Sequence, residues 1–115
     1  MKKVSIFILL MLFSNTVFSA GLANCGTVSI QNLYVQGDRG GDNSFHANKM
    51  LVIMGPEKLA ACDDFTFAYL ENTDDAYEST LSMVLAAYMA GKKIRIQIEN
   101  NPAQNASKRI AWVNF

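Results

Sequence analysis

The residue best suited to acid–base chemistry is His46, the only histidine in the chain. Ser44 lies two residues before it, and residues i and i+2 of a strand point to the same face. A Ser–His contact is therefore conceivable. No aspartate is evidently placed to orient the imidazole, and a Ser-His-Asp site is defined by geometry rather than by spacing. We interpret His46 as a polar histidine at a strand edge, and we expect no catalytic residues.

Carboxylates occur as two adjacent pairs, Asp63-Asp64 and Asp74-Asp75. Adjacent residues point to different faces, so neither pair is arranged as a general acid and base. The second pair suits a helix N-terminus, and the first suits a solvated turn. The segment "GDRGGDN" over 37–43 offers oxygen ligands, but it lacks the longer spaced set ending in Glu that an EF-hand requires. With no P-loop or dinucleotide motif either, we expect no metal site and no cofactor.

Aromatic side chains are a stronger indication of binding, because they offer flat faces to sugar rings or to proteins. Tyr69, Tyr77 and Trp112 fit core packing better than binding. Tyr34 differs, because it stands beside the polar turn that begins at Gln36. An aromatic face next to mixed hydrogen-bonding groups suits a small polar ligand. The predicted ligand site consists of Tyr34, Gln36, Asp38 and Arg39.

The two cysteines are Cys25 and Cys62. An even number of cysteines in an exported chain indicates a disulfide. Two cysteines alone make a poor structural zinc site, which requires four ligands. We predict a Cys25–Cys62 disulfide, and the chain-entropy model gives it a stabilisation of about 4 kcal/mol.

The N-terminus has the pattern of a secretory signal peptide. Lys2 and Lys3 precede an apolar run over 4–13, and small residues follow near a cleavage site. We expect a signal peptide over 1–19, with cleavage after Ala23 as the alternative, and one disulfide-linked domain over 20–115. The segment "LANC" resembles a lipobox, but Asn24 stands where Gly, Ala or Ser is usual, which disfavours a lipid anchor. The expected location is the periplasm or the extracellular medium.

Charge argues against a nucleic-acid partner. The chain carries ten basic and ten acidic residues. Removal of Lys2 and Lys3 leaves eight basic residues, so the net charge of the mature chain is −2. The longest basic run, Lys92-Lys93, falls at the expected end of a helix, where cations suit the helix dipole. The sequence has no basic patch of the kind that binds nucleic acid, and no stable membrane span is expected after cleavage.

The order of elements is three strands, one helix and two strands. The first strand runs from Val28 to Val35, and its alternation slips by one residue at Asn32, which indicates a bulge. The remaining elements are expected at Met50–Met54 (strand), Phe65–Glu71 (strand), 72–92 (helix), Ile94–Glu99 (strand) and Arg109–Phe115 (strand). Gly91 suits the C′ position that ends a helix. In the fourth strand, Ile94, Ile96 and Ile98 should face inward.

The helix has two sides of different character. One is a broad apolar face, expected to cover the sheet, made by Tyr77, Leu81, Val84, Leu85 and Tyr88. The other has small or flexible residues that would let a neighbouring subunit or a loop approach closely. The predicted oligomer interface consists of Thr80, Met83, Ala87 and Ala90. Alanine is also simply a good helix former.

The order βββαββ is that of the OB-fold, a five-stranded Greek-key barrel with a helix between its third and fourth strands. We predict a mainly β domain of this kind, in which the helix plugs one end of the barrel. The alternative is an α+β domain with the helix packed on one face of an antiparallel sheet.

A resemblance to a known family rests on Cys25, Cys62 and the segment "LSMVLAAYMAGKKIRIQI" (81–98). In element order the chain resembles the B subunits of bacterial A–B pentamer toxins, with a layout most similar to the subtilase-cytotoxin and pertussis-like subunits. It is also similar to small exported bacterial proteins of no assigned role. The toxin resemblance implies a ring of five subunits, helices lining its centre, and glycans bound on the barrel sides.

Two functions therefore stand as hypotheses. The first is a secreted, non-enzymatic binding module, in its oligomeric form a toxin-B-like subunit that recognises glycan. The second is a monomeric periplasmic or envelope protein that interacts with, or inhibits, another protein. Self-association separates the two.

Overall fold

The computed structural model of the chain describes residues 21–38, 45–101 and 107–115. The segment expected to be a signal peptide lies outside the described residues. So do Arg39, Ser44 and most of the polar turn over 37–43.

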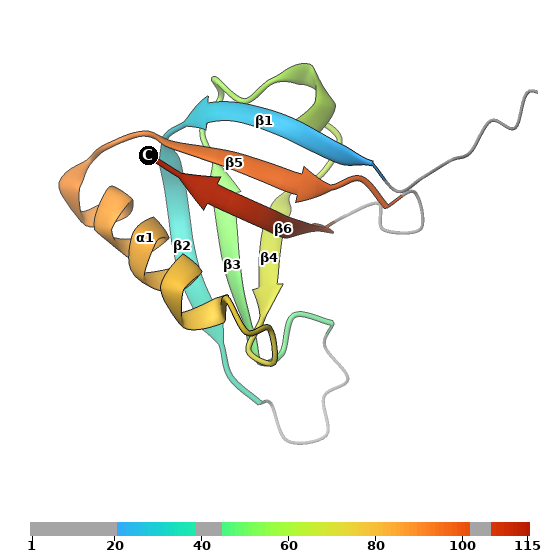
Figure 1. Cartoon of the computed structure of the whole chain (residues 1–115), viewed down its shortest axis with the longest axis vertical. Coiled ribbons are helices and arrows are strands. Elements are labelled where there is room, and N and C mark those ends of the chain that lie inside the picture. The colour runs from blue at the N-terminus through green and yellow to red at the C-terminus, as the bar shows by residue number, and fades with distance from the viewer. Residues whose placement is uncertain (1–20, 39–44, 102–106) are drawn as a thin grey trace, which may run out of the picture.

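The described residues form six strands, one helix and one short 3-10 turn. They are β1 (Leu22–Val28), β2 (Ile30–Gln36), β3 (Lys49–Met54), η1 (Ala60–Cys62), β4 (Phe67–Glu71), α1 (Tyr77–Ala90), β5 (Ile94–Glu99) and β6 (Ser107–Asn114). Figure 1 shows α1 beside β2, with β1, β5 and β6 crossing over the strands β2, β3 and β4. The expected class, mainly β with one helix, is confirmed.

The strands form one mixed sheet in the order β1-β5-β6-β4-β3-β2. The pair β4–β6 is parallel, and the other four pairs are antiparallel. Six strands replace the expected five because β1 was not predicted: the first predicted strand, from Val28 to Val35, corresponds to β2 and shares only Val28 with β1. β1 and β2 are divided from each other and lie at opposite edges of the sheet, and the described residues show no pairing between them.

The division occurs at Ser29, between the end of β1 and the start of β2. The amide and hydroxyl of Ser29 both donate hydrogen bonds to the Glu57 carboxylate. The carbonyl of Ser29 accepts a bond of 2.9 Å from the Gly55 amide. A Cβ atom on Gly55 would lie 2.1 Å from the Ser29 hydroxyl, so only glycine allows this approach. The β3–β4 connection therefore holds the bend between β1 and β2.

The predicted bulge in this segment is confirmed. The register of β2 against β3 shifts between Ile30 and Asn32. The alternation in the sequence slips at the same place, since one extra residue moves all later side chains to the opposite face.

The helix ends as predicted and begins later than predicted. Gly91 closes it with a left-handed φ of 64°, which glycine adopts without strain. At the other end, Ala76 occupies the N-cap position, and Asp74 accepts a 2.9 Å hydrogen bond from the Ala76 amide. Residues 72–76 form turns instead, and in one of them the Asp74 amide donates a hydrogen bond to the Glu71 carbonyl.

The orientation of α1 corrects the predicted oligomer interface. Thr80 and Ala87 are buried in the chain's own core, together with Val84. Met83 is half-buried against that core, and Ala90 is exposed. The helix packs on β2 and β6, and small side chains allow its backbone to approach them closely. The surface expected to meet a subunit is therefore mostly occupied by the protein's own sheet.

The core lies between the strands and the buried side of α1. Ile94, Ile96 and Ile98 are fully buried, as predicted from their alternation. The other large buried members are Val28, Met50, Val52, Met54, Phe65, Leu70, Val84 and Ile110. In the part of the chain that the structure describes, no helix is both long and apolar enough to cross a membrane.

Candidate functional site

A second cluster of side chains lies on the outer face of β2, β3 and β4. Cross-strand pairing places Tyr34 opposite Leu51, and Leu51 opposite Tyr69. Leu51 and Tyr69 are 0% and 2% exposed, yet neither belongs to the main core. Strand residues alternate between faces, so these side chains point away from the face that carries Met50 and Val52. The sheet thus has apolar groups on both sides.

Aromatic rings gather over this outer face. The Tyr34 and Phe67 centroids are 6.1 Å apart, and His46 lies 5.0 Å from Phe67. Phe45 lies 5.3 Å from His46 and 5.2 Å from Tyr69. All four pairs meet edge to face, the arrangement that aromatic quadrupoles favour. We call Tyr34, Phe45, His46, Phe67 and Tyr69 the aromatic face.

Exposure divides the aromatic face into a floor and a rim. Tyr69 forms the floor with Leu51, whereas Phe45 is 49% exposed. Tyr34, His46 and Phe67 are half-buried. The partly exposed rings therefore offer apolar surface to an external ligand on a support that does not need to rearrange.

Cationic groups border the aromatic face. The Lys49 amine lies 4.4 Å from the Phe45 centroid and 5.8 Å from the Tyr69 centroid, and it donates to the Phe45 carbonyl. Arg109 pairs with Tyr69 across the parallel strands. Its guanidinium donates to Asp74 and, at 3.4 Å, to Glu99. The hydrogen bond to Asp74 raises the Arg109 pKa. The Asp74 pKa is lowered, first by the hydrogen bond from the Ala76 amide and second by the hydrogen bond from Arg109.

His46 has a hydrogen-bonding partner distant in sequence. Its Nε2 atom lies 2.8 Å from Ser107 Oγ, across a separation of 61 residues. Desolvation, and then the charge of Lys49, lower the His46 pKa below its ordinary value of 6.5. Ser107 is 4% exposed, so its hydroxyl is closed to a substrate. The pair thus joins the turn before β3 to β6. The serine that contacts His46 is Ser107, not the Ser44 that the sequence suggests.

The predicted ligand-site residues are only partly brought together. Tyr34 belongs to the aromatic face, and Gln36, two residues later on the same face of β2, pairs with Lys49. Asp38 is exposed beyond the end of β2, and Arg39 lies outside the described residues. Sequence reasoning missed Phe45 and Phe67 as neighbours of Tyr34. The alternation of Phe67 and Tyr69 shows in the sequence that the two rings share one face of a strand. The sequence does not show that β3 brings this strand next to β2 and Tyr34.

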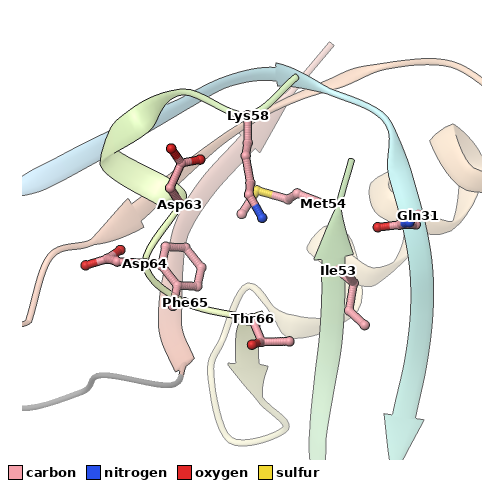
Figure 2. Close-up of a pocket in the computed structure, with 8 residues that line it drawn as sticks. All are labelled: Gln31, Ile53, Met54, Lys58, Asp63, Asp64, Phe65 and Thr66. Carbon is pink, nitrogen blue, oxygen red and sulfur yellow. The ribbon is translucent and has the colours of Figure 1, made fainter. Parts of the chain in front are cut away.

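A separate open cavity of about 310 Å³ lies between β2, β3 and the β3–β4 connection. Figure 2 shows the Lys58 side chain reaching toward Met54, with Phe65 beside it and Asp63 and Asp64 at the outer wall. Positive and negative side chains both line the cavity, together with apolar ones. The lining therefore favours neither an anionic nor a cationic ligand. Among the described residues, no group of three His, Cys, Asp or Glu side chains could hold a metal ion.

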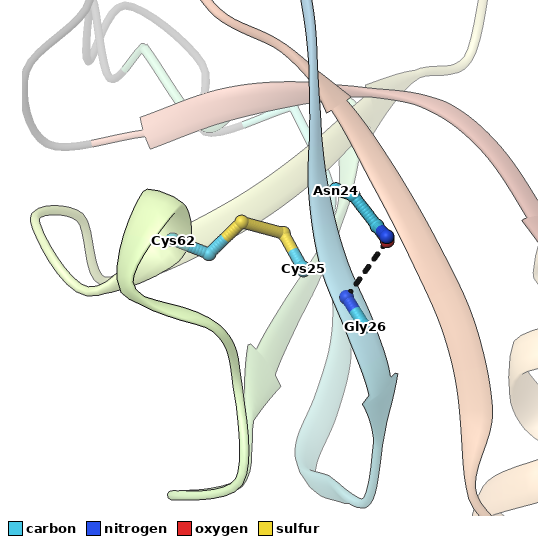
Figure 3. Close-up of a disulfide and its surroundings, with 4 residues drawn as sticks. All are labelled: Asn24, Cys25, Gly26 and Cys62. Carbon is cyan, nitrogen blue, oxygen red and sulfur yellow. Dashed lines mark hydrogen bonds between the residues drawn. A yellow bond between two sulfur atoms is a disulfide. The ribbon is translucent and has the colours of Figure 1, made fainter.

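The predicted disulfide is confirmed and anchors the wall of this cavity. Cys25 of β1 joins Cys62 of η1, with Cα atoms 5.4 Å apart (Figure 3). The register of β1 shifts between Asn24 and Gly26, and Asn24 Oδ1 accepts a 2.9 Å bond from the Gly26 amide. Gly26 has a φ of 80°, which favours glycine. This bulge places Cys25 opposite η1.

Comparison with models of known protein families, with curated proteins and with solved structures finds no match to this chain.

Proposed function

We propose that the protein is an exported, non-enzymatic binding module that holds a glycan on its aromatic face. The observation that carries the proposal is the set of partly exposed rings of Tyr34, Phe45 and Phe67 over the buried floor of Leu51 and Tyr69. A cluster of this kind outside the main core is not needed to complete that core.

The chemistry of the aromatic face suits a sugar. A pyranose ring has an apolar face that packs on an aromatic ring, and hydroxyl groups at its edge that require hydrogen-bonding partners. Lys49 and Gln36 lie at one end of the aromatic face and offer such groups. Binding sites commonly combine apolar walls with a few placed polar groups. The calculated net charge of −2 for the mature chain disfavours a nucleic-acid ligand.

The strand order supports an OB-like barrel for this module. If β1 and β2 are counted as one bent strand, the chain has five strands, and the pairing order runs from the first through the second, third, fifth and fourth strands back to the first. The aromatic face then comes from the first and third strands, β2 and β4, and from the end of the connection between the first and second strands, where Phe45 and His46 lie. OB-folds bind oligosaccharides and oligonucleotides at the face of the second and third strands and at this connection. The Cys25–Cys62 disulfide is in keeping with export.

The test is binding of the purified, oxidised protein to an array of immobilised glycans, followed by measurement of Kd for the best ligand. We expect Tyr34→Ala to weaken binding about tenfold, because one stacking ring is lost. Tyr88→Ala is the matched control, since it removes an exposed tyrosine from α1.

Absence of glycan binding, or equal loss in the two variants, would contradict the proposal. That result would favour the alternative function, an interaction or inhibitor protein of the envelope.

A further inference from the structure

The outward side of α1 exposes large apolar side chains to solvent. Leu85, Tyr88 and Met89 are 46%, 42% and 76% exposed, whereas Val84 and Ala87 on the opposite side are fully buried. Soluble monomers rarely leave neighbouring apolar groups of this size uncovered on one face of a helix. A partner that covers them would remove this apolar area from water.

The exposed residues form a line with a charge at each end. Glu78, Ser82, Leu85 and Met89 follow spacings of four, three and four, which place them along one side of a helix. We call these four residues the outer stripe. Glu78 lies in the first turn of α1, and Lys92 follows Gly91 just beyond the last turn. Leu85 is seven residues from each of the two charges.

We propose that the outer stripe of one copy packs antiparallel on the outer stripe of a second copy, with a two-fold axis at Leu85. An antiparallel arrangement brings Glu78 of each copy to Lys92 of the other, at both ends of the contact. A parallel arrangement would instead bring Glu78 to Glu78 and Lys92 to Lys92. Opposite charges therefore meet only when the two helices are antiparallel. In that arrangement both copies use the same surface.

The size of the side chains permits this contact. Ser82 is exposed on the outer stripe and Ala86 is exposed beside it. Small side chains at these positions let two helix axes approach to about 8–10 Å, the usual packing distance. Glu78 and Ala90, the last helical residue, are separated by about 18 Å along the helix at 1.5 Å rise per residue, and Lys92 lies just beyond the left-handed Gly91. One contact of this length is small, so we expect a reversible dimer rather than an obligate one.

The aromatic face lies on β2, β4 and the turn before β3, and it contributes nothing to this contact. The dimer therefore does not rest on the proposed glycan binding, and either proposal can fail without the other. The dimer also differs from the five-membered ring implied by the toxin resemblance, because an isologous pair is complete with two copies.

The experiment is light scattering and sedimentation of the purified, oxidised protein over a range of concentrations. We expect a monomer–dimer equilibrium that Leu85→Glu abolishes. Glu78→Lys should weaken dimerisation about tenfold, because two attractive pairs become repulsive. The exchanged variant Glu78→Lys/Lys92→Glu should restore the Kd to within about threefold, because both pairs become attractive again.

Ser79→Lys is the matched control, since it adds a positive charge one position away and off the outer stripe. Its dimerisation should match that of the unaltered protein, and circular dichroism confirms that each variant is folded. A monomer at every concentration, a pentamer, or a dimer indifferent to Leu85→Glu would overturn the proposal. Failure of the exchanged variant to recover would overturn the antiparallel arrangement.

Discussion

The Nε2 atom of His46 lies 2.8 Å from the Oγ atom of Ser107. This bond joins the turn before β3 to the first residue of β6, and it does so at the edge of the aromatic face. Because Ser107 is buried and His46 is packed against Phe67, the pair contributes to structure and keeps the aromatic rings in place.

Ser107→Ala should lower the free energy of unfolding by about 1 kcal/mol, because His46 loses a partner in a partly buried position. Chemical denaturation measures the change. Ser82→Ala on the exposed side of α1 is the control and should shift stability by less than about 0.5 kcal/mol. Equal effects of the two substitutions would show that the His46–Ser107 bond contributes nothing.

Stability should fall as the pH drops below the ordinary histidine value. The His46 pKa is lower in the folded protein than its ordinary value of 6.5, so the unfolded chain takes up the proton first. The stabilisation that neutral His46 provides is complete above pH 6.5 and is lost as the pH falls through the lower pKa of the folded protein. His46→Gln should flatten the stability curve between about pH 7.5 and 5.5, above most carboxylate titrations. An NMR titration of the sole histidine that gave a pKa at or above 6.5 would contradict this prediction.

Glu57 should support stability in acid. Its bonds from the Ser29 hydroxyl and amide lower the pKa from 4.5 to about 2. Its contribution is present above 4.5 and is lost as the pH falls through about 2. Glu57→Gln should therefore reduce the loss of stability across this range, as measured by denaturation at several pH values. Asp63→Asn, which removes an exposed carboxylate from the same connection, is the control for the loss of one negative charge. Equal changes of the curve in the two variants would contradict the prediction.

Removal of the disulfide should be strongly destabilising. The Cys25→Ala/Cys62→Ala variant loses a cross-link that spans 37 residues, with an expected cost of about 4 kcal/mol on the chain-entropy model. For a domain of this size the Tm should fall by more than about 10 °C. Reduction of the unaltered protein should produce a similar fall, and an unchanged Tm in both cases would contradict the prediction.

The side of α1 that faces the core can be tested by enlarging two alanines. Ala87→Leu should cost about 1–3 kcal/mol, because Ala87 is fully buried against the sheet. Ala90→Leu, three residues later and exposed, should change stability by less than about 0.5 kcal/mol. Thermal denaturation of both variants checks the orientation, and the reverse ranking would show that α1 is rotated.

Several features followed from signals that are local in the sequence. The alternation of Ile94, Ile96 and Ile98 identified a strand and its buried face, and Gly91 identified the end of the helix. The slip at Asn32 identified the bulge. Each of these depends on a periodicity or a backbone preference that acts within a few residues, so no knowledge of distant contacts was needed.

Other features depended on residues that are distant in the chain and meet only in the fold. The bend at Ser29 is held by Glu57, 28 residues away, and the partner of His46 is 61 residues away. The side of α1 that is buried was decided by the close approach of its small residues to β2 and β6, although Leu85 and Tyr88 were the more apolar choice. The sequence by itself thus determined most of the elements and the disulfide, but not β1 or the start of the helix. Only tertiary packing decided which faces met and which aromatic rings came together, because that choice depends on the shape of surfaces built from separate segments.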